Sequence, residues 1–262
     1  MLLTAEQRRL LLERYQRVYP VSELGYSTVR DYCDSCDYLP FLSSYQGDLK
    51  DFERPWTVKA ILGTCPKGST LLEIGAGEPI VAQALAELGY KVVVVDPYDG
   101  SARGPTEYQY FRSAYPDVTI HRALFSSELP DLPRKAFSCV YSISVLEHIS
   151  GPALSLTFQA IRTFLAPGGL SLHSIDHVTE GRDAEFHRQN LTDILKHQLD
   201  LSRTAAAAAP AALVESLESN LRTDIDTYYL SAAGHNLWRG QTPYDQFPYR
   251  KVASILSCHQ MA

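Results

Sequence analysis

A short glycine-containing run, Leu71–Pro79, has residue types that could hold a cofactor. Gly75 and Gly77 let the backbone turn sharply and let a ligand come close to it. An apolar segment precedes the run and a helical pattern follows it, so the glycines stand at a strand-to-helix turn. Asp96 ends the next apolar segment, where a carboxylate can accept hydrogen bonds from the two hydroxyls of a ribose. The pattern predicts a site for a cofactor that contains a nucleoside.

A nicotinamide dinucleotide is one candidate ligand. Its G-x-G-x-x-G fingerprint uses the third glycine for close helix packing and places the pyrophosphate at the helix N-terminus. Here the bulky Ile80 occupies the third position, and Glu73 and Glu78 would put negative charge beside a pyrophosphate. These features weigh against an oxidoreductase.

S-adenosylmethionine suits the same residues better, because it has no phosphate and carries an ammonium and a sulfonium group. A carboxylate at Glu73 is costly to bury without a partner, and a cationic ligand provides one directly or through water. A tight turn without a ligand is disfavoured because the two glycines, Glu73 and Asp96 occur together in a strand–turn–helix–strand context.

Histidines and carboxylates follow the later apolar segments, where an open α/β sheet binds its substrate. An aspartate beside a histidine can orient the imidazole, which makes His177, next to Asp176, a candidate general base. Glu147 and His148 follow the preceding segment; packing or capping is favoured for Glu147, and His148 is kept as a further candidate. The predicted catalytic residues are His177, Asp176 and His148.

A metal site is the competing use of these groups. Asp176 and His177, with Glu185 and His187, have ligand atoms that suit a divalent ion. Their spacing matches no compact metal motif, and the C-x-x-C pair Cys33–Cys36 has no second pair nearby to complete a zinc site. No metal is predicted.

Alternating strand and helix patterns must position these groups, and such alternation indicates βαβ units, a parallel sheet and an α/β fold. The predicted strands are Thr70–Ile74, Val92–Val95, Val118–His121, Ser138–Ile143 and Leu170–Ile175, and the predicted helices are Val81–Leu88 and Pro152–Leu165.

Composition limits the partners. The 262 residues carry a formal net charge of -6, and this acidic balance without a Lys/Arg run disfavours nucleic acid. The N-terminus lacks the apolar core of a signal peptide, and no apolar run approaches the roughly 20 residues that span a bilayer. The 5 cysteines, an odd and low number, favour a reducing compartment. We expect a cytoplasmic protein without a membrane partner.

Several segments together resemble successive motifs of the class I methyltransferases: Leu71–Pro79, Asp96, Phe137–Ile149 and Phe164–Gly169. The resemblance implies a Rossmann-like fold with a mostly parallel seven-stranded sheet flanked by helices, and S-adenosylmethionine as cofactor. Two departures stand out. Pro79 replaces a frequent third glycine, and Ala123–Phe125 replaces the usual acid-and-small-residue pair near the adenine.

The resemblance also implies roles for single residues. Glu73 and the glycine turn would hold the methionine end, Asp96 the ribose hydroxyls, and Leu124 with Phe125 the adenine. Ser142 and Ile143 would line the mouth of the fourth strand. The residues so assigned to the cofactor are Glu73, Gly75, Ala76, Gly77, Asp96, Pro97, Leu124, Phe125, Ser142 and Ile143.

Two aromatic stretches outside these motifs are candidates for closing the site. Tyr26 and Arg30 could fold over the cofactor and meet its methionine carboxylate, with a packing arm as the alternative. The stretch 224–238 combines aromatic and polar groups, as a small-molecule pocket does, although a satellite core has the same composition. Its predicted substrate contacts are Tyr228, Tyr229, His235 and Trp238.

Four parts are predicted along the chain: an N-terminal helical extension or lid, a Rossmann-like cofactor-binding core, a helical cap insertion, and a part that completes the sheet and the substrate pocket. Their bounds are 1–68, 69–178, 179–222 and 223–262. Within them, Thr4 is expected to cap the first helix and residues 25–50 to be loop-like. A short helix is expected from Pro55, and Tyr249–Leu256 as an edge strand.

The combined features predict a methyltransferase that O- or N-methylates a small molecule, with a sugar or another secondary metabolite preferred as acceptor. The enclosing cap and the acidic surface favour this function. A monomer or homodimer is expected. A protein methyltransferase and a non-catalytic module that binds S-adenosylmethionine stay open as alternatives.

Overall fold

The computed structural model describes residues 2–43, 45, 47–101, 104–181, 183–202, 208–233 and 249–262. Its strands are β1 (Leu24–Tyr26), β2 (Thr70–Ile74), β3 (Lys91–Asp96), β4 (Thr119–Arg122), β5 (Phe137–Ile143), β6 (Leu165–Gly181) and β7 (Tyr249–Gln260). Its α-helices are α1 (Ala5–Tyr15), α2 (Val29–Tyr38), α3 (Lys50–Thr64), α4 (Ile80–Glu87), α5 (Tyr108–Ala114), α6 (Gly151–Phe164), α7 (Ala184–Ser202) and α8 (Pro210–Thr223). Short 3-10 helices are η1 (Pro40–Leu42) and η3 (Leu146–His148).

The strands form one seven-stranded sheet in the order β1-β7-β6-β5-β2-β3-β4. The strands from β6 to β4 are parallel, β7 is antiparallel to β6, and β1 is antiparallel to β7. The mostly parallel seven-stranded sheet expected from the sequence is confirmed. The prediction that residues 249–256 return to the sheet as a strand is confirmed by β7, but their expected edge position is wrong, because β1 pairs with β7, with Leu24 opposite Ser257, and covers that edge.

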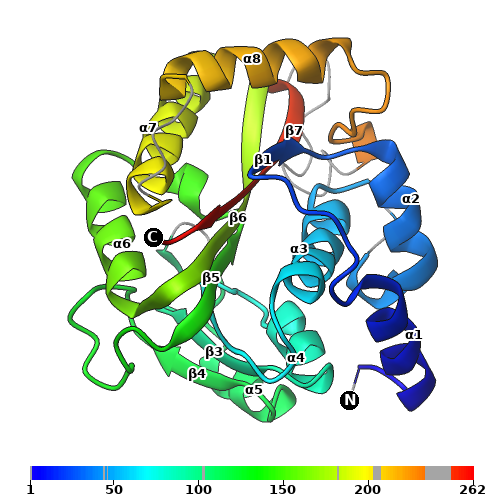
Figure 1. Cartoon of the computed structure of the whole chain (residues 1–262), viewed down its shortest axis with the longest axis vertical. Helices are drawn as coiled ribbons and strands as arrows, with labels where there is room; N and C mark the ends of the chain where they lie inside the picture. Colours follow the sequence, from blue (N-terminus) through cyan, green and yellow to red (C-terminus); the bar gives the residue numbers. More distant parts are fainter. Residues whose placement is uncertain are drawn as a thin grey trace.

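Helices cover both faces of the sheet (Figure 1). On one face, α3 and α4 contribute buried side chains such as Phe52 and Leu85, and α1, capped by Thr4 as predicted, joins this layer. On the other face, α6 and α7 contribute buried side chains such as Phe158 and Ile194. The parallel strands between these layers are therefore apolar on both sides.

The N-terminal region contains more regular structure than its polar sequence suggests. Residues 25–50, expected to be loop-like, contain α2 and most of β1. The buried Lys59 of α3 donates hydrogen bonds to the carboxylate and the backbone carbonyl of Asp31 in α2, so a distant side chain holds this helix in place. α3 itself starts at Lys50, and the expected start, Pro55, lies inside it.

The helices predicted as a cap belong largely to the layer that covers the sheet. α7 packs against β6 and β7 and buries Leu191 and Leu195. α8 packs on α7 and crosses the upper end of β6 in Figure 1. Because β6 runs to Gly181, the predicted boundary at residue 178 falls inside a strand.

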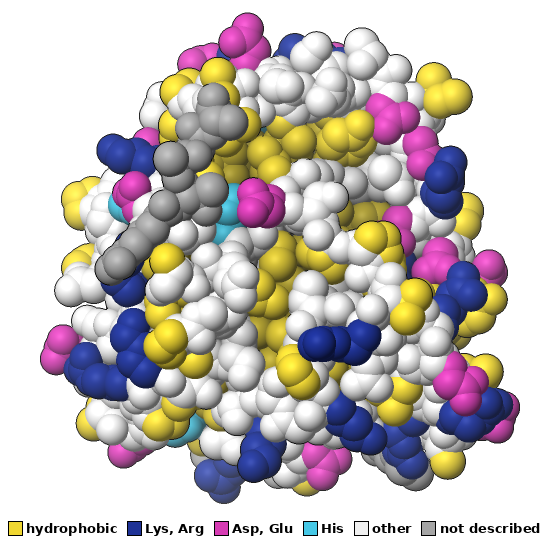
Figure 2. Space-filling view, viewed as in Figure 1, with side chains coloured by type: hydrophobic (Ala, Val, Ile, Leu, Met, Phe, Trp, Pro, Cys, Tyr) yellow, Lys and Arg dark blue, Asp and Glu magenta, His cyan; other side chains and the backbone are white. Residues whose placement is uncertain are grey.

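The described surface carries both signs of charge. On the coloured part of the face in Figure 2, Asp and Glu side chains lie mostly toward the upper and right edges, and Lys and Arg side chains lie mostly over the lower half. Within the described ranges, no helix combines the length and the apolar character needed to cross a membrane.

Candidate functional site

A cavity of about 610 Å³ opens at the carboxyl ends of β2, β3 and β5. Parallel α/β sheets bind their ligands at this edge. The cavity reaches from the turn after β2 to Asp176 in β6. The residues on its wall that the sequence singled out are Glu73, Gly75, Ala76, Gly77, Asp96, Pro97, Leu124, Phe125, Ile143, His148 and Asp176.

The turn after β2 requires its glycines. Gly75 and Gly77 have φ values of +65° and +58°, in the left-handed region that side chains disfavour. A Cβ at Gly75 would lie 2.9 Å from Cγ2 of Val145. The backbone therefore lines the cavity without side chains in the way, and a ligand can approach the turn closely.

Asp96 fixes this turn from the end of β3. Its Oδ2 accepts a hydrogen bond from the N–H of Gly77 at 2.9 Å, and its Oδ1 accepts one from the N–H of Tyr98 at 2.9 Å. Each carboxylate oxygen can accept more than one hydrogen bond, so the same group can both hold the turn and bind hydroxyls of a ligand in the cavity.

Glu73 is a buried acid near the end of β2, and only 2% of its surface is exposed. Burial raises its pKa to about 8, although the Tyr141 hydroxyl donates to its Oε2 at 3.1 Å and favours the charged form. The positive charges of Arg54 and Lys50 also lower the pKa of Glu73. Both cations lie on the cavity wall, so the wall offers both charges to a zwitterionic amino-acid group.

The two residues expected beside an adenine differ in accessibility. The Leu124 side chain is 75% exposed at the rim of the cavity. The Phe125 ring packs on Phe164 of α6, with 5.9 Å between ring centroids. An aromatic wall fixed in this way and an exposed leucine suit a flat apolar group near the cavity mouth.

The opposite end of the cavity is acidic. Asp176 is on the wall and is buried. Glu53 of α3 and Glu147 of η3 lie close enough for their negative charges to raise the pKa of Asp176, in addition to the larger effect of burial. Ser144, at the end of β5, also lines the cavity and donates its hydroxyl hydrogen to Oε2 of Glu53.

The predicted catalytic pair Asp176–His177 is not a pair in the structure. Consecutive residues of a strand point to opposite faces of the sheet. Because β6 continues to Gly181, His177 points away from Asp176. Its Nε2 lies 3.0 Å from Oε1 of Glu218 in α8, and the ring is buried. The assignment of His177 as general base is therefore corrected.

Ser142 does not line the cavity, because consecutive residues of β5 point to opposite faces of the sheet. Its neighbour Ile143 lines the cavity, whereas the Ser142 hydroxyl lies 2.7 Å from Nδ1 of His173. His173 is fully buried and also lies 2.8 Å from the hydroxyl of Ser171 through Nε2. Ser142 thus belongs to a buried polar network of neighbouring strands.

The two residues predicted to meet the methionine carboxylate lie elsewhere. The Tyr26 hydroxyl donates to Asp224 at 2.9 Å. The Arg30 side chain is 89% exposed, and its Nε lies 3.9 Å from Asp226. Both side chains therefore hold the segment after α8 against the N-terminal region, which corrects their assignment to the cofactor. Lys50 and Arg54 are the cations on the cavity wall.

The predicted substrate contacts also fall outside this cavity where they are described. Tyr228 stacks on Tyr32 with 4.6 Å between ring centroids, which is the satellite-core alternative. The Tyr229 hydroxyl donates to the backbone carbonyl of Leu221 at 3.1 Å. His235 and Trp238 lie outside the described residues.

Several residues on the cavity wall were not predicted from the sequence, among them Lys50, Arg54, Tyr98 and Ser144. Lys50 and Arg54 are four residues apart and therefore share one face of α3. Because this helix was expected to start only at Pro55, both residues fell outside the predicted helix. Ser144 has a φ of +50°, an uncommon conformation that no sequence signal marked.

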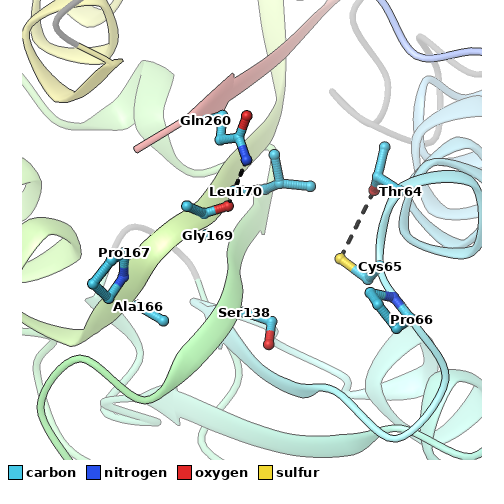
Figure 3. Close-up of a pocket in the computed structure, with 10 residues that line it drawn as sticks. Thr64, Cys65, Pro66, Ser138, Ala166, Pro167, Gly169, Leu170 and Gln260 are labelled. Atoms are coloured by element: carbon cyan, nitrogen blue, oxygen red, sulfur yellow. Dashed lines mark hydrogen bonds between the residues drawn. The ribbon is translucent and has the colours of Figure 1, made fainter. Parts of the chain in front are cut away.

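A second cavity, of about 440 Å³, lies at the amino ends of β5 and β6 (Figure 3). It is lined by Cys65, Ser138, residues 166–170 and Gln260, among others, and Gln260 donates to the Gly168 carbonyl at 2.9 Å. The described residues that line it include no carboxylate, imidazole or amine. The first cavity is therefore the candidate active site.

A family model described as a methyltransferase domain matches residues 55–247. The ubiquinone biosynthesis O-methyltransferase of Dinoroseobacter shibae is 32% identical over 111 residues, and the match spans 41% of this chain and 41% of that protein. The chain thus covers less than half the length of this curated relative.

Two solved structures are similar at low identity. The YcgJ protein from Bacillus subtilis has a TM-score of 0.47 and 13% identity, covering 80% of this chain and 97% of that chain. A SAM-dependent methyltransferase from Aquifex aeolicus has a TM-score of 0.44 and 15% identity, covering 60% of this chain and 84% of that chain.

Proposed function

This chain belongs to the methyltransferase domain family, and on that basis we propose that it uses S-adenosylmethionine to methylate a small molecule bound in the cavity after β2, β3 and β5. One observation carries the proposal. The glycine turn and the acidic group Asp176 line the same cavity of about 610 Å³, a size typical of small-molecule sites.

The cofactor half of the cavity has the groups that S-adenosylmethionine requires. Glu73, which is buried on the cavity wall, would pair with the ammonium group of the cofactor. Asp96 would accept hydrogen bonds from the ribose hydroxyls while it holds Gly77. Leu124 and Phe125 would border the adenine.

Methyl transfer is an in-line displacement in which the cofactor supplies the methyl group. The protein contributes mainly by holding the acceptor atom against that methyl group and by receiving a proton where one must leave. Asp176 and Ser144 are placed at the acceptor end of the cavity, and His148 lies on its wall with a side chain that is 55% exposed. We assign the acceptor contacts to these residues.

The proposal also includes a small-molecule partner and a reducing compartment. The mixed charge of the surface in Figure 2 supports a small acceptor rather than a nucleic acid. All five cysteines are free, which suits a reducing compartment such as the cytoplasm.

Calorimetry and a transfer assay test the proposal. We expect S-adenosylmethionine and S-adenosylhomocysteine to bind the wild type with micromolar dissociation constants, and Asp96→Ala to weaken both at least tenfold. Asp131→Ala, which changes an exposed aspartate, is the matched control and should bind as the wild type does.

The acceptor class is then read from extracts incubated with methyl-labelled cofactor. We expect label in the small-molecule fraction. Label confined to protein or RNA would contradict the small-molecule proposal, and an Asp96→Ala variant that binds normally would remove Asp96 from the site.

A further inference from the structure

Three carboxyl groups from separate parts of the chain meet behind the acceptor end of the cavity. Glu53 comes from α3, Glu147 from η3 and Asp176 from β6, and their exposed fractions are 0%, 4% and 5%. We call these three residues the carboxyl cluster. Within the described part of the chain, no backbone N–H or hydroxyl group donates a hydrogen bond to Glu53 Oε1 or to Asp176 Oδ1, and these two carboxyl groups lie within hydrogen-bonding distance of each other.

Such a cluster is unfavourable in an empty site. A buried carboxylate without donors is costly, and adjacent carboxyl groups raise each other's pKa. The pKa of Glu147 is raised to about 8 by burial and by the charge of Glu53. The pKa of Asp176 is raised well above its usual range by burial and by Glu53 and Glu147. In proteins generally, a buried polar group without a hydrogen-bond partner is uncommon and calls for an explanation.

The cluster faces the cavity through Asp176. Asp176 and Ser144 are on the wall, and Ser144 binds Glu53, which lies behind it. Lys50 is a positive group near the cluster and lowers the pKa of both Glu147 and Asp176. Because burial and mutual repulsion raise the pKa values of Glu147 and Asp176, a positive ligand is favoured at this site, since it stabilises the ionised forms of these carboxyl groups.

The charge of the acceptor follows from this arrangement. An acceptor that reacts as a phenolate or carries a carboxylate near the reacting atom would be repelled by the cluster. A neutral hydroxyl would supply one hydrogen bond and no charge. A protonated amine supplies several N–H donors and a positive charge, and so satisfies the orphaned oxygens and the electrostatics together.

We propose that the carboxyl cluster binds the protonated amino group of the methyl acceptor, and that the reaction is therefore N-methylation of an amine. This inference rests on the proposed function, since it names the acceptor of the same cavity. Asp176 is the group that contacts the amine, and Glu53 and Glu147 are positioning residues behind it.

The carboxyl cluster accepts the proton that the acceptor amine must lose. Binding of the positive ammonium group favours the ionised form of Asp176, whose own proton goes to solvent. The Asp176 carboxylate then takes one proton from the ammonium group, which frees the nitrogen lone pair. The nitrogen then forms a bond to the methyl carbon while the carbon–sulfur bond breaks, its electron pair going to sulfur. The product is a methylated ammonium ion and a neutral thioether, and Asp176 returns its proton to solvent. The raised pKa of Asp176 brings it closer to that of an amine and makes it a better base.

The test uses the small-molecule fraction of a cell extract as the acceptor mixture, with methyl-labelled S-adenosylmethionine. One half is treated with an amine-selective N-hydroxysuccinimide acetate and then with hydroxylamine, which removes acetyl groups from oxygen. We expect the wild-type enzyme to lose at least about tenfold of the incorporated label after this treatment. Equal labelling of both halves would overturn the inference and leave the proposed function standing. No label in either half would contradict the proposed function itself.

Variants separate the acceptor from the cofactor. Asp176→Asn is expected to lower kcat/KM at least about 100-fold in the untreated extract, as loss of a general base does. Its affinities for S-adenosylmethionine and S-adenosylhomocysteine should stay within twofold of wild type. A selective loss of S-adenosylmethionine affinity would show that the cluster serves the sulfonium group instead and would refute the assignment. Glu185→Gln, which changes an exposed residue of α7, is the control, and the acetylation result stands independently of any variant.

Discussion

Replacing Glu73 with glutamine should change how the stability of the cofactor-free protein depends on pH. Glutamine keeps the shape and an oxygen that can accept the hydrogen bond from Tyr141, but it has no proton to lose. The wild-type carboxyl group is buried, and its pKa is about 8 instead of the usual 4.5. Between these pH values the folded state retains a proton that the unfolded state has released.

The sign and size follow from proton linkage. Because the unfolded state binds fewer protons in this window, the free energy of unfolding of the wild type falls as pH rises, by about 1.4 kcal/mol per pH unit. Below about pH 4.5 both states are protonated and the effect is absent; it is complete above about pH 8. The whole window corresponds to about 5 kcal/mol. Glu73→Gln should therefore gain stability relative to wild type by about this amount between pH 4.5 and pH 8.

Urea unfolding of both proteins at pH 5, 6, 7 and 8 measures this difference directly. Only the difference between the two proteins is used, because Glu147 and Asp176 also have raised pKa values and affect both proteins alike. Glu215→Gln, an exposed position of α8, should run parallel to wild type. If Glu73→Gln also ran parallel to wild type over this range, the argument that Glu73 is buried and protonated would be refuted.

Two further changes test the backbone turn and the N-terminal packing. Gly75→Ala should lower the free energy of unfolding by about 1–2 kcal/mol because of the positive φ at this position. It should also weaken cofactor binding, since its Cβ would lie 2.9 Å from a valine methyl. The control is Gly68→Ala, where φ is +88° and the space is open; urea unfolding should show the stability loss, and calorimetry should show unchanged cofactor binding. Lys59→Met should destabilise the protein by about 3 kcal/mol, because it leaves the carboxylate of Asp31 without its buried cation. Thermal unfolding measures this loss, with Lys67→Met, a change at an exposed lysine, as the control. Equal melting temperatures of the two variants would contradict the prediction.

Local sequence patterns predicted the elements that depend on local physics. β2 has the bounds Thr70–Ile74 that its apolar run predicts, and α4 begins and ends within one residue of the expected helix. The short edge strand β1 was not predicted, because Leu24–Tyr26 becomes a strand only by pairing with β7. The helix α2 was missed for a related reason, since the contact that holds it comes from Lys59 in another helix.

The length of β6 explains the main error about the site. Its apolar run ends near Ile175, so Asp176 and His177 were placed together in a loop after the strand. Pairing with β7 extends β6 to Gly181. Inside a strand, neighbouring side chains alternate between the two faces, and only Asp176 reaches the cavity. A strand end set by a partner strand cannot be read from the strand's own residues.

The sequence by itself located the residues that we propose for the cofactor, because Glu73, the glycine turn and Asp96 lie at the ends of two adjacent strands whose patterns are local. The tertiary structure alone decided the acceptor half. Glu53, Glu147 and Asp176 are far apart along the chain and meet only because α3, η3 and β6 pack at one end of the cavity. Spacing along the chain carries no information about such a meeting, because it depends on how helices pack against the sheet.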